Sequence, residues 1–299
     1  MKVSKPSQEI FKIIEDTAGE NSYHILVEPV EFEITCKSGN KTIEISKFDA
    51  YVERMIAIPE GVDPEKVTTG VVLNPDGTFS HVPTEIVAVD GKYYARIKSL
   101  TNSIYSVIYS PVEFVDVTNH WAKEAINDMA SRLIIGGVGN SRFEPNREIT
   151  RAEFAAIMTK ALGLQLGTGE NLFEDVNDTA WYCDFVKTTA DYKIISGYGN
   201  RKFGPQDKIT REQTMTMIAR AMQITDLEVN MDIYEAQTLL GAFKDSDQLA
   251  EWSKEGMALC IRAGIISGKA DHMLGPKDHI TRGEVAVIVR RLLKTSDLI

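Results

Sequence analysis

The chain has 299 residues, of which 43% are hydrophobic and 25% charged, and it carries a net charge of −10. This composition is typical of a soluble protein long enough for two or three domains. Its apolar runs fall short of the roughly 18 residues that a membrane span requires, and its lysines and arginines do not cluster. We therefore expect neither membrane insertion nor nucleic-acid binding.

The first third of the chain has the two-residue period of β-strands. Residues 1–22 are expected to be a linker or the tail of a missing domain. From residue 23 to residue 112, alternating segments such as 30–34 predict strands, and the turn sequences around Asn40 and Pro75 predict hairpins. We predict an antiparallel β-sandwich-like domain over residues 23–112.

The remaining two-thirds contains one pattern three times. Each copy has Phe-x-Asp, then a tryptophan, then Ile-Ile starting 13 residues after the tryptophan, then glycine, proline and Ile-Thr-Arg at constant spacing. Identical spacing of this kind is the signature of a repeat architecture. The repeats are assigned to residues 113–166, 167–225 and 243–299, and residues 226–242 between the last two predict a short connector helix.

Each repeat is predicted to be a helix, a loop and a second helix. The first helix should start near the tryptophan, place Trp121 on its apolar face with Ile126 and Met129, and end at the glycine after Ile-Ile. The second helix should begin with a capping box, as in Thr150 with Glu153. A single hairpin cannot bury its apolar face, so the three must pack together.

Other kinds of site leave no pattern in the sequence. The three cysteines lack the spacing of metal ligands or of a disulfide framework, and the five histidines are expected at the surface. Hydrolase, transferase and phosphate-loop motifs are absent from the sequence. We therefore expect no enzyme activity, no metal site and no cofactor.

Together, the motifs over residues 113 to about 295 resemble the S-layer-homology module, which commonly occurs as three tandem copies. The resemblance implies an all-α, pseudo-threefold spindle in which the first helices form a central three-helix bundle and the second helices form three prongs. The β region resembles spacer domains of Gram-positive-type surface proteins. We expect the chain to be the C-terminal part of a longer exported protein, located at the cell surface in the cell wall or S-layer.

The resemblance also implies what the repeats bind. In the family, grooves between prongs bind secondary cell-wall polysaccharide, often with a pyruvate ketal on N-acetylmannosamine. Carried over to matching positions, the candidate polysaccharide-binding residues are Arg151, Arg211, Arg282, Trp121, Trp181, Trp252, Asp116, Asp175, Asp245, Gly137, Gly197, Gly268, Gly139, Gly199, Asn140 and Asn200.

The arginines support this interpretation independently. Each occupies the first position of a helix, where the helix dipole disfavours a cation. A guanidinium beside free helix N–H groups would suit a carboxylate-bearing sugar. The alternatives are structural: an arginine salt bridge to a neighbouring repeat, an aspartate that accepts hydrogen bonds in a turn, and a tryptophan buried in the core.

Repeat 3 departs from the pattern, because Ala270 and Asp271 replace its Gly-Asn pair. Since alanine adopts positive φ at a cost and aspartate repels a carboxylate, Arg282 is expected to contribute less to binding than Arg151 or Arg211. The leading function is non-catalytic anchoring on wall polysaccharide. The alternatives are a protein-interaction scaffold for S-layer neighbours and glycan binding by the β domain.

Overall fold

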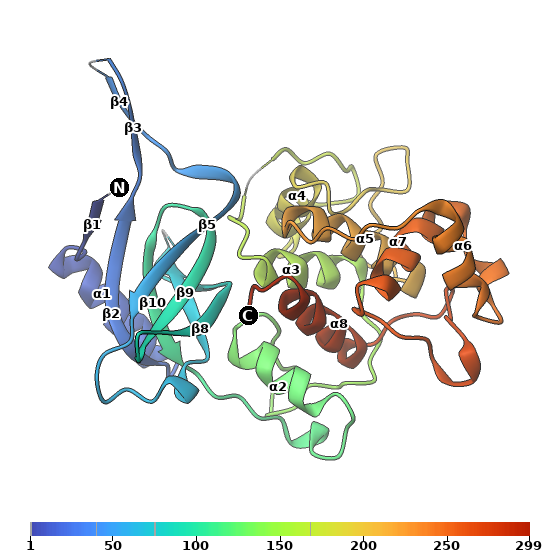
Figure 1. The fold of residues 1–299 in the computed structure, drawn as a ribbon, viewed down its shortest axis with the longest axis horizontal. Helices are drawn as coiled ribbons and strands as arrows, with labels where there is room; N and C mark the ends of the chain where they lie inside the picture. Colours follow the sequence, from blue (N-terminus) through green and yellow to red (C-terminus); the bar gives the residue numbers. More distant parts are fainter. Residues whose placement is uncertain (1, 40, 75, 168) are drawn as a thin grey trace.

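The computed structural model describes residues 2–39, 41–74, 76–167 and 169–299. An N-terminal region of antiparallel sheet is followed by a helical region that contains the three repeats, as the sequence predicts (Figure 1). The turn residues Asn40 and Pro75 lie outside the described part. Within that part, no helix is both long enough and apolar enough to cross a membrane.

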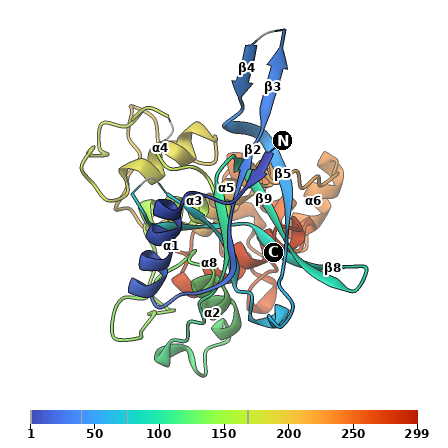
Figure 2. The ribbon, with the colours of Figure 1, turned by 90° about the vertical axis from the view of Figure 1, so that its left-hand side faces the viewer.

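Two antiparallel sheets pack face to face in the β domain. One has the strand order β1-β2-β10-β6-β7 and the other the order β5-β9-β8. Their shared core includes Val107 from the first sheet and Ile97 from the second, which makes the domain sandwich-like. The strands are β1 (Lys2–Ser4), β2 (His24–Glu33), β5 (Lys47–Ala57), β6 (Thr69–Leu73), β7 (Phe79–Val82), β8 (Thr84–Val89), β9 (Lys92–Thr101) and β10 (Ile104–Tyr109). A separate hairpin of β3 (Thr35–Ser38) and β4 (Lys41–Glu44) projects away from both sheets (Figure 2).

The N-terminal segment is not the linker or domain tail that the sequence predicted. Strand β1 pairs with β2, and residues 8–20 form helix α1 (Gln8–Glu20), which is capped by the Ser7 side chain. The helix buries Ile14 and Ala18, and Thr17 donates a hydrogen bond to the Gly77 carbonyl at 2.6 Å. The apolar positions among residues 10–14 belong to a helical stripe that packs against the β domain.

The repeats have the predicted helix–loop–helix form. The helices are α2 (Lys123–Ser131) and α3 (Arg151–Ala161) in repeat 1, α4 (Cys183–Asp191) and α5 (Arg211–Ile224) in repeat 2, and α7 (Glu251–Arg262) and α8 (Arg282–Thr295) in repeat 3. Capping boxes begin α3, α5 and α8 at Thr150, Thr210 and Thr281, as predicted. The segment between repeats 2 and 3 contains α6 (Ile233–Gly241), capped by Asp232.

The three repeats close on one another in a ring. The second helix of each repeat packs on the first helix of the next, so that α3 contacts α4, α5 contacts α7 and α8 contacts α2. The hydrogen bonds between the Ile-Thr-Arg segments run in the opposite direction around the ring, from each repeat to the preceding one. The N–H of Ile149 donates to Ile280, that of Ile280 to Ile209, and that of Ile209 to Ile149, at 3.1–3.2 Å. This cycle gives the pseudo-threefold arrangement.

The central helices are the second ones, not the first ones that the resemblance implied. Eight of the eleven residues of α3 are buried, against four of the nine residues of α2. In Figure 1, α2, α4 and α7 lie outside α3, α5 and α8. The order follows from the Ile-Thr-Arg ring, because it brings the N-termini of the second helices together near the axis.

The first helices also differ in detail from the prediction. Trp121 precedes α2 and is 67% exposed, so it does not belong to the apolar face that Ile126 and Met129 form. Helix α2 ends at Ser131 because Leu133 adopts a left-handed conformation (φ 63°), well before the glycine after Ile-Ile. Lys193 and Gly264 adopt the same conformation after α4 and α7.

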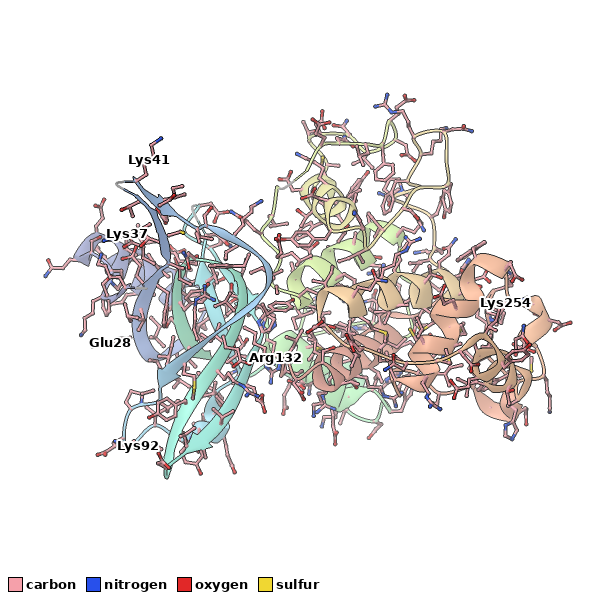
Figure 3. All side chains as sticks on the ribbon, turned by 45° about the horizontal axis from the view of Figure 1, so that its top comes forward. Glu28, Lys37, Lys41, Lys92, Arg132 and Lys254 are labelled. Atoms are coloured by element: carbon pink, nitrogen blue, oxygen red, sulfur yellow. The ribbon has the colours of Figure 1, made fainter. Side chains whose placement is uncertain are left out.

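The β domain packs directly on the repeats. Tyr51 donates a hydrogen bond to the Leu162 carbonyl at 2.7 Å, and Arg132 donates to the Thr84 carbonyl at 3.3 Å. Arg132 lies at the boundary between the β domain and the helical region (Figure 3). Leu100 of β9 is part of the core of the helical region. His81 is buried near this boundary, contrary to the predicted surface location, and its Nδ1 lies 2.6 Å from the Thr69 hydroxyl.

Candidate functional site

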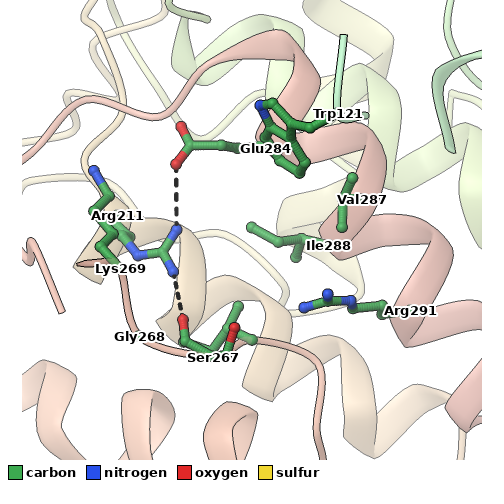
Figure 4. Close-up of a pocket in the computed structure, with 10 residues that line it drawn as sticks. Trp121, Arg211, Ser267, Gly268, Lys269, Glu284, Val287, Ile288 and Arg291 are labelled. Atoms are coloured by element: carbon green, nitrogen blue, oxygen red, sulfur yellow. Dashed lines mark hydrogen bonds and ion pairs between the residues drawn. The ribbon is translucent and has the colours of Figure 1, made fainter. Parts of the chain in front are cut away.

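Two grooves occupy equivalent places around the pseudo-threefold axis. The first, here called the Arg151 groove, has a volume of about 370 Å³. The second, the Arg211 groove, has a volume of about 220 Å³ and is shown in Figure 4. Equivalent lining positions are Arg151 and Arg211, Ser196 and Ser267, Gly197 and Gly268, Tyr198 and Lys269, Gln213 and Glu284, Thr216 and Val287, Met217 and Ile288, Arg220 and Arg291, and Trp252 and Trp121.

Each groove needs all three repeats. In the Arg151 groove, the arginine comes from repeat 1, the loop at Ser196 and helix α5 from repeat 2, and Trp252 from repeat 3. In the Arg211 groove, the same parts come from repeats 2, 3 and 1 in turn. Neither groove can therefore form within one repeat or between two.

The arginines of the three Ile-Thr-Arg segments, here called the triplet arginines, each hydrogen-bond to a loop of the next repeat. Arg151 donates from Nε to the Phe203 carbonyl and from Nη2 to the Ser196 carbonyl, both at 2.8 Å. Arg282 makes the equivalent bonds to Phe143 and Gly136, at 2.8 and 2.6 Å. Burial lowers the pKa of both guanidiniums. They remain cationic, because an arginine side chain is not deprotonated in proteins.

Arg211 combines this role with an ion pair. Its Nη2 donates to the Ser267 carbonyl at 3.1 Å, and its Nη1 lies 3.5 Å from the Glu284 carboxylate of repeat 3 (Figure 4). Burial lowers its pKa, and the Glu284 carboxylate opposes that effect. The salt bridge to a neighbouring repeat, an alternative from the sequence, is thus present at this arginine.

The helix N–H groups beside the arginines are not free, so that part of the argument from the sequence is wrong. The N–H of Arg151 donates to Asp207, that of Ala152 donates to Pro205, and that of Glu153 donates to the Thr150 hydroxyl, at 3.0–3.2 Å. An arginine at the first helical position has a structural reason instead, because carbonyl groups of the next repeat face it.

The Phe-x-Asp aspartates accept hydrogen bonds within their own repeats. Asp116 accepts from the N–H groups of Phe143 and Glu144 at 2.9 and 2.8 Å. Asp175 and Asp245 accept equivalent pairs in repeats 2 and 3. Partial burial opposes ionisation of Asp116, but the two backbone donors outweigh it and lower its pKa. The structure therefore shows the aspartates in the turn-acceptor role.

The predicted glycines and asparagines shape the loops. A Cβ at Gly137 would lie 2.7 Å from the Phe114 ring and 2.8 Å from the Arg142 carbonyl oxygen, so only glycine fits. Four of the predicted residues adopt positive φ in the tight loops: Gly139, Gly199, Asn140 and Asn200, with φ of 100°, 97°, 50° and 48°. Of the predicted glycines and asparagines, Gly197 and Gly268 line the two grooves described above.

The loop of repeat 3 differs from the prediction in its conformation and in the arginine that it borders. Its positive-φ residues are Asp271 and His272, at φ of 58° and 57°, and the loop closes with a hydrogen bond from Lys269 N–H to the Met273 carbonyl at 2.6 Å. Aspartate tolerates this conformation better than most residues. The loop borders Arg211 rather than Arg282. Arg282 was therefore ranked lowest for a loop that belongs to the groove of Arg211.

The side chains most available to a ligand are the tryptophans and a second set of basic residues. Trp121, Trp181 and Trp252 are 67%, 61% and 56% exposed, which contradicts the core alternative. Arg220 and Arg291 line the grooves from α5 and α8, nine residues after the triplet arginines. They were not among the residues predicted from the sequence, although a basic residue recurs at this spacing in every repeat.

A third set of residues occupies the positions that correspond to the two grooves, and its chemistry differs from theirs. It comprises Arg282, Lys160 and Trp181, with Ala156 at the position of Thr216 and Val287. The Lys160 ammonium lies 5.7 Å from the centre of the Phe185 ring, and burial lowers its pKa. Lys160 replaces the arginine of the other two sets and lies over an aromatic ring, so we expect this set to interact with a ligand differently.

The two grooves are electropositive in an acidic protein. The Arg151 groove has two arginines and no carboxylate among its lining residues. The Arg211 groove has two arginines and a lysine against Glu284. Over the described residues, no cluster of three or more histidine, cysteine, aspartate or glutamate side chains could hold a metal ion. Exposed indole rings beside fixed guanidiniums suit an anionic sugar.

Comparison with known proteins matches the repeats. The family model of the S-layer homology domain matches residues 113–155, 172–215 and 242–286. An amylopullulanase of Thermoanaerobacterium thermosulfurigenes is 29% identical over 92% of this chain, a match that extends into the β domain, and this covers 14% of the relative. An exoglucanase of Acetivibrio thermocellus is 31% identical over 66% of the chain, covering 18% of the relative.

A surface-layer protein of Lysinibacillus sphaericus is 29% identical over 59% of the chain. That match covers 14% of its length. The chain thus spans less than a fifth of the length of each of these three relatives.

Proposed function

Because the chain carries three S-layer homology domains, we propose that it anchors a larger protein at the bacterial cell surface by binding cell-wall polysaccharide in the Arg151 and Arg211 grooves. The anchoring part itself performs no catalysis. The glycosidases among the relatives are five or more times longer than the segment they share with this chain.

The observation that supports this proposal best is the repeated composition of the two grooves. Each presents one exposed tryptophan, Trp252 or Trp121, opposite an arginine on the second helix, Arg220 or Arg291. The indole offers a stacking face for a sugar ring, and the guanidinium offers donors to a carboxylate or hydroxyl. Arg151 and Arg211 donate hydrogen bonds to the Ser196 and Ser267 carbonyls, and so fix the loop that forms one wall of each groove.

We further propose that the ligand carries a carboxylate, as a pyruvate ketal would provide. The two grooves are cationic although the whole chain has a net charge of −10. Screening over about 8 Å at physiological ionic strength lets these local arginines outweigh the distant negative charges.

The test uses the full chain and wall polysaccharide released with hydrofluoric acid. We expect the double variant Arg220→Ala/Arg291→Ala to lose at least about tenfold in affinity, since each substitution removes a charge-assisted donor. The control is Lys254→Ala/Lys294→Ala, which removes the same charge from one half-buried and one exposed position outside both grooves, as Arg220 is half-buried and Arg291 exposed. An equal loss of affinity in both variants would show that the interaction is non-specific charge attraction.

Polysaccharide stripped of pyruvate should bind about tenfold more weakly, the effect of one lost charge-assisted bond. Equal affinity for both preparations would refute the carboxylate and leave recognition of neutral sugars. A scaffold that binds only S-layer neighbours would leave the purified polysaccharide unbound.

A further inference from the structure

A second cleft adjoins the Arg151 groove. This interdomain cleft has a volume of about 410 Å³ and lies between the β domain and repeat 2. One wall is formed by residues 47–49 of β5, and the other by residues 191–193 and the C-terminal half of α5. Arg220 lines both the cleft and the Arg151 groove, so the two spaces meet at this side chain.

A bulge in β5 builds the β-domain wall of the cleft. Lys47 pairs with Thr101 and Val52 with Ser99, so four residues of β5 stand opposite Leu100 alone. Such a bulge redirects side chains out of the sheet and is common beside binding sites. Residues 48–51 reach repeat 1 through the hydrogen bond from Tyr51 to Leu162, and the bulge brings Phe48 and Asp49 into the cleft.

The cleft presents chemistry suited to sugar hydroxyls. Two half-buried aromatic rings, Phe48 and Tyr192, line it from opposite domains. Burial raises the pKa of Tyr192, and the nearby carboxylates of Asp191 and Asp49 raise it further, so one acid from each domain lies close to the phenol.

The cations around the cleft nearly balance the acids. Lys47, Lys193 and Arg220 stand against Asp49 and Asp191. Neutral sugars offer hydroxyl groups that both donate and accept hydrogen bonds, and apolar ring faces that stack on aromatic side chains. A near-neutral cleft with both features favours such units over a second anionic group.

We propose that the interdomain cleft binds the neutral sugar units that precede the anionic unit held in the Arg151 groove, with the β domain supplying one wall of this extended site. The inference rests on the proposed function of the groove. It gives the β domain a direct role in binding.

The residues beside the Arg211 groove differ from those of the interdomain cleft. The positions that correspond to Asp191, Tyr192 and Lys193 are Arg262, Ala263 and Gly264 in repeat 3. The stacking ring and the acid are missing there, so the two grooves should differ in their preference for ligand length.

The test compares two sizes of wall-polysaccharide fragment, disaccharides with the terminal anionic sugar and longer oligosaccharides from the same preparation. The variant is Lys47→Ala/Asp49→Ala in the full chain, which changes two exposed β-domain residues. We expect its affinity for the longer fragments to fall about tenfold, as for the loss of one or two hydrogen bonds to charged groups, with no change for disaccharides. The matched control is Glu60→Ala/Lys92→Ala, also exposed and outside the cleft.

The outcomes separate the two proposals. If the wild type binds both sizes but the cleft variant matches it for the longer fragments, the cleft proposal is refuted while the groove proposal stands. If the wild type binds neither size, both fail. An equal loss in the control variant would also refute the cleft, because the effect would then be one of overall charge.

Discussion

Replacement of Arg151 by alanine should destabilise the fold rather than simply remove a ligand contact. Arg151 is only 3% exposed. It donates two charge-assisted hydrogen bonds, to the carbonyls of Phe203 and Ser196, and its guanidinium lies 4.4 Å from the centre of the Tyr198 ring. Each such bond contributes about 1.5–3 kcal/mol, so Arg151→Ala should lower the free energy of unfolding by about 3–5 kcal/mol.

The matched control is Arg220→Ala in the same groove. Arg220 is half-buried, and the bond recorded for it runs from Nη1 to the Ser196 hydroxyl at 3.1 Å. Because this bond is exposed to solvent, its loss should lower the free energy of unfolding by only about 0.5–1 kcal/mol. Urea unfolding followed by tryptophan fluorescence measures both variants. If the free energies of unfolding of Arg151→Ala and Arg220→Ala differed by less than about 1 kcal/mol, the hydrogen bonds of Arg151 would not be a main link between repeats 1 and 2.

Three further predictions concern other sites. Trp252→Ala should weaken polysaccharide binding in titration calorimetry without a comparable loss of stability, because the ring is 56% exposed; an unfolded variant would contradict that placement. Gly137→Ala should lower the thermal midpoint, since its Cβ would lie 2.7 Å from the Phe114 ring, whereas Gly136→Ala, with no atom within 4 Å of its Cβ, should be tolerated. Burial, and then the charge of Arg132, keep the pKa of His81 well below 6.5. The unfolded chain therefore takes up this proton first, and stability should fall below about pH 6.5 by up to about 1.4 kcal/mol per pH unit. Thermal unfolding between pH 7.5 and pH 5 should show a shallower slope for His81→Gln, and identical slopes would place the titration elsewhere.

The features that the sequence predicted correctly are local in the chain. The capping boxes at Thr150, Thr210 and Thr281 depend on a side chain and a backbone group three residues apart, so spacing alone identifies them. The two-residue period of the β region and the helix–loop–helix form of the repeats likewise follow from short-range patterns. The helix before Tyr23 was missed because its apolar stripe is brief and its partner, the β domain, cannot be seen in the local pattern.

The features that required the tertiary structure join distant residues. The groove of Arg151 is closed by Ser196 of the next repeat and Trp252 of the third, and the spacing within one repeat carries no information about which copy supplies which part. The same limit led to the wrong pairing of the repeat 3 loop with Arg282 instead of Arg211.

The sequence by itself therefore determined that three copies of one helical unit follow a β domain, because periodicity and capping act over a few residues. The tertiary structure decided which helices lie at the centre, which arginines are buried clamps and which remain available to a ligand. Those properties depend on the direction in which the ring closes, and the ring is set by hydrogen bonds among Ile149, Ile209 and Ile280 across the three repeats.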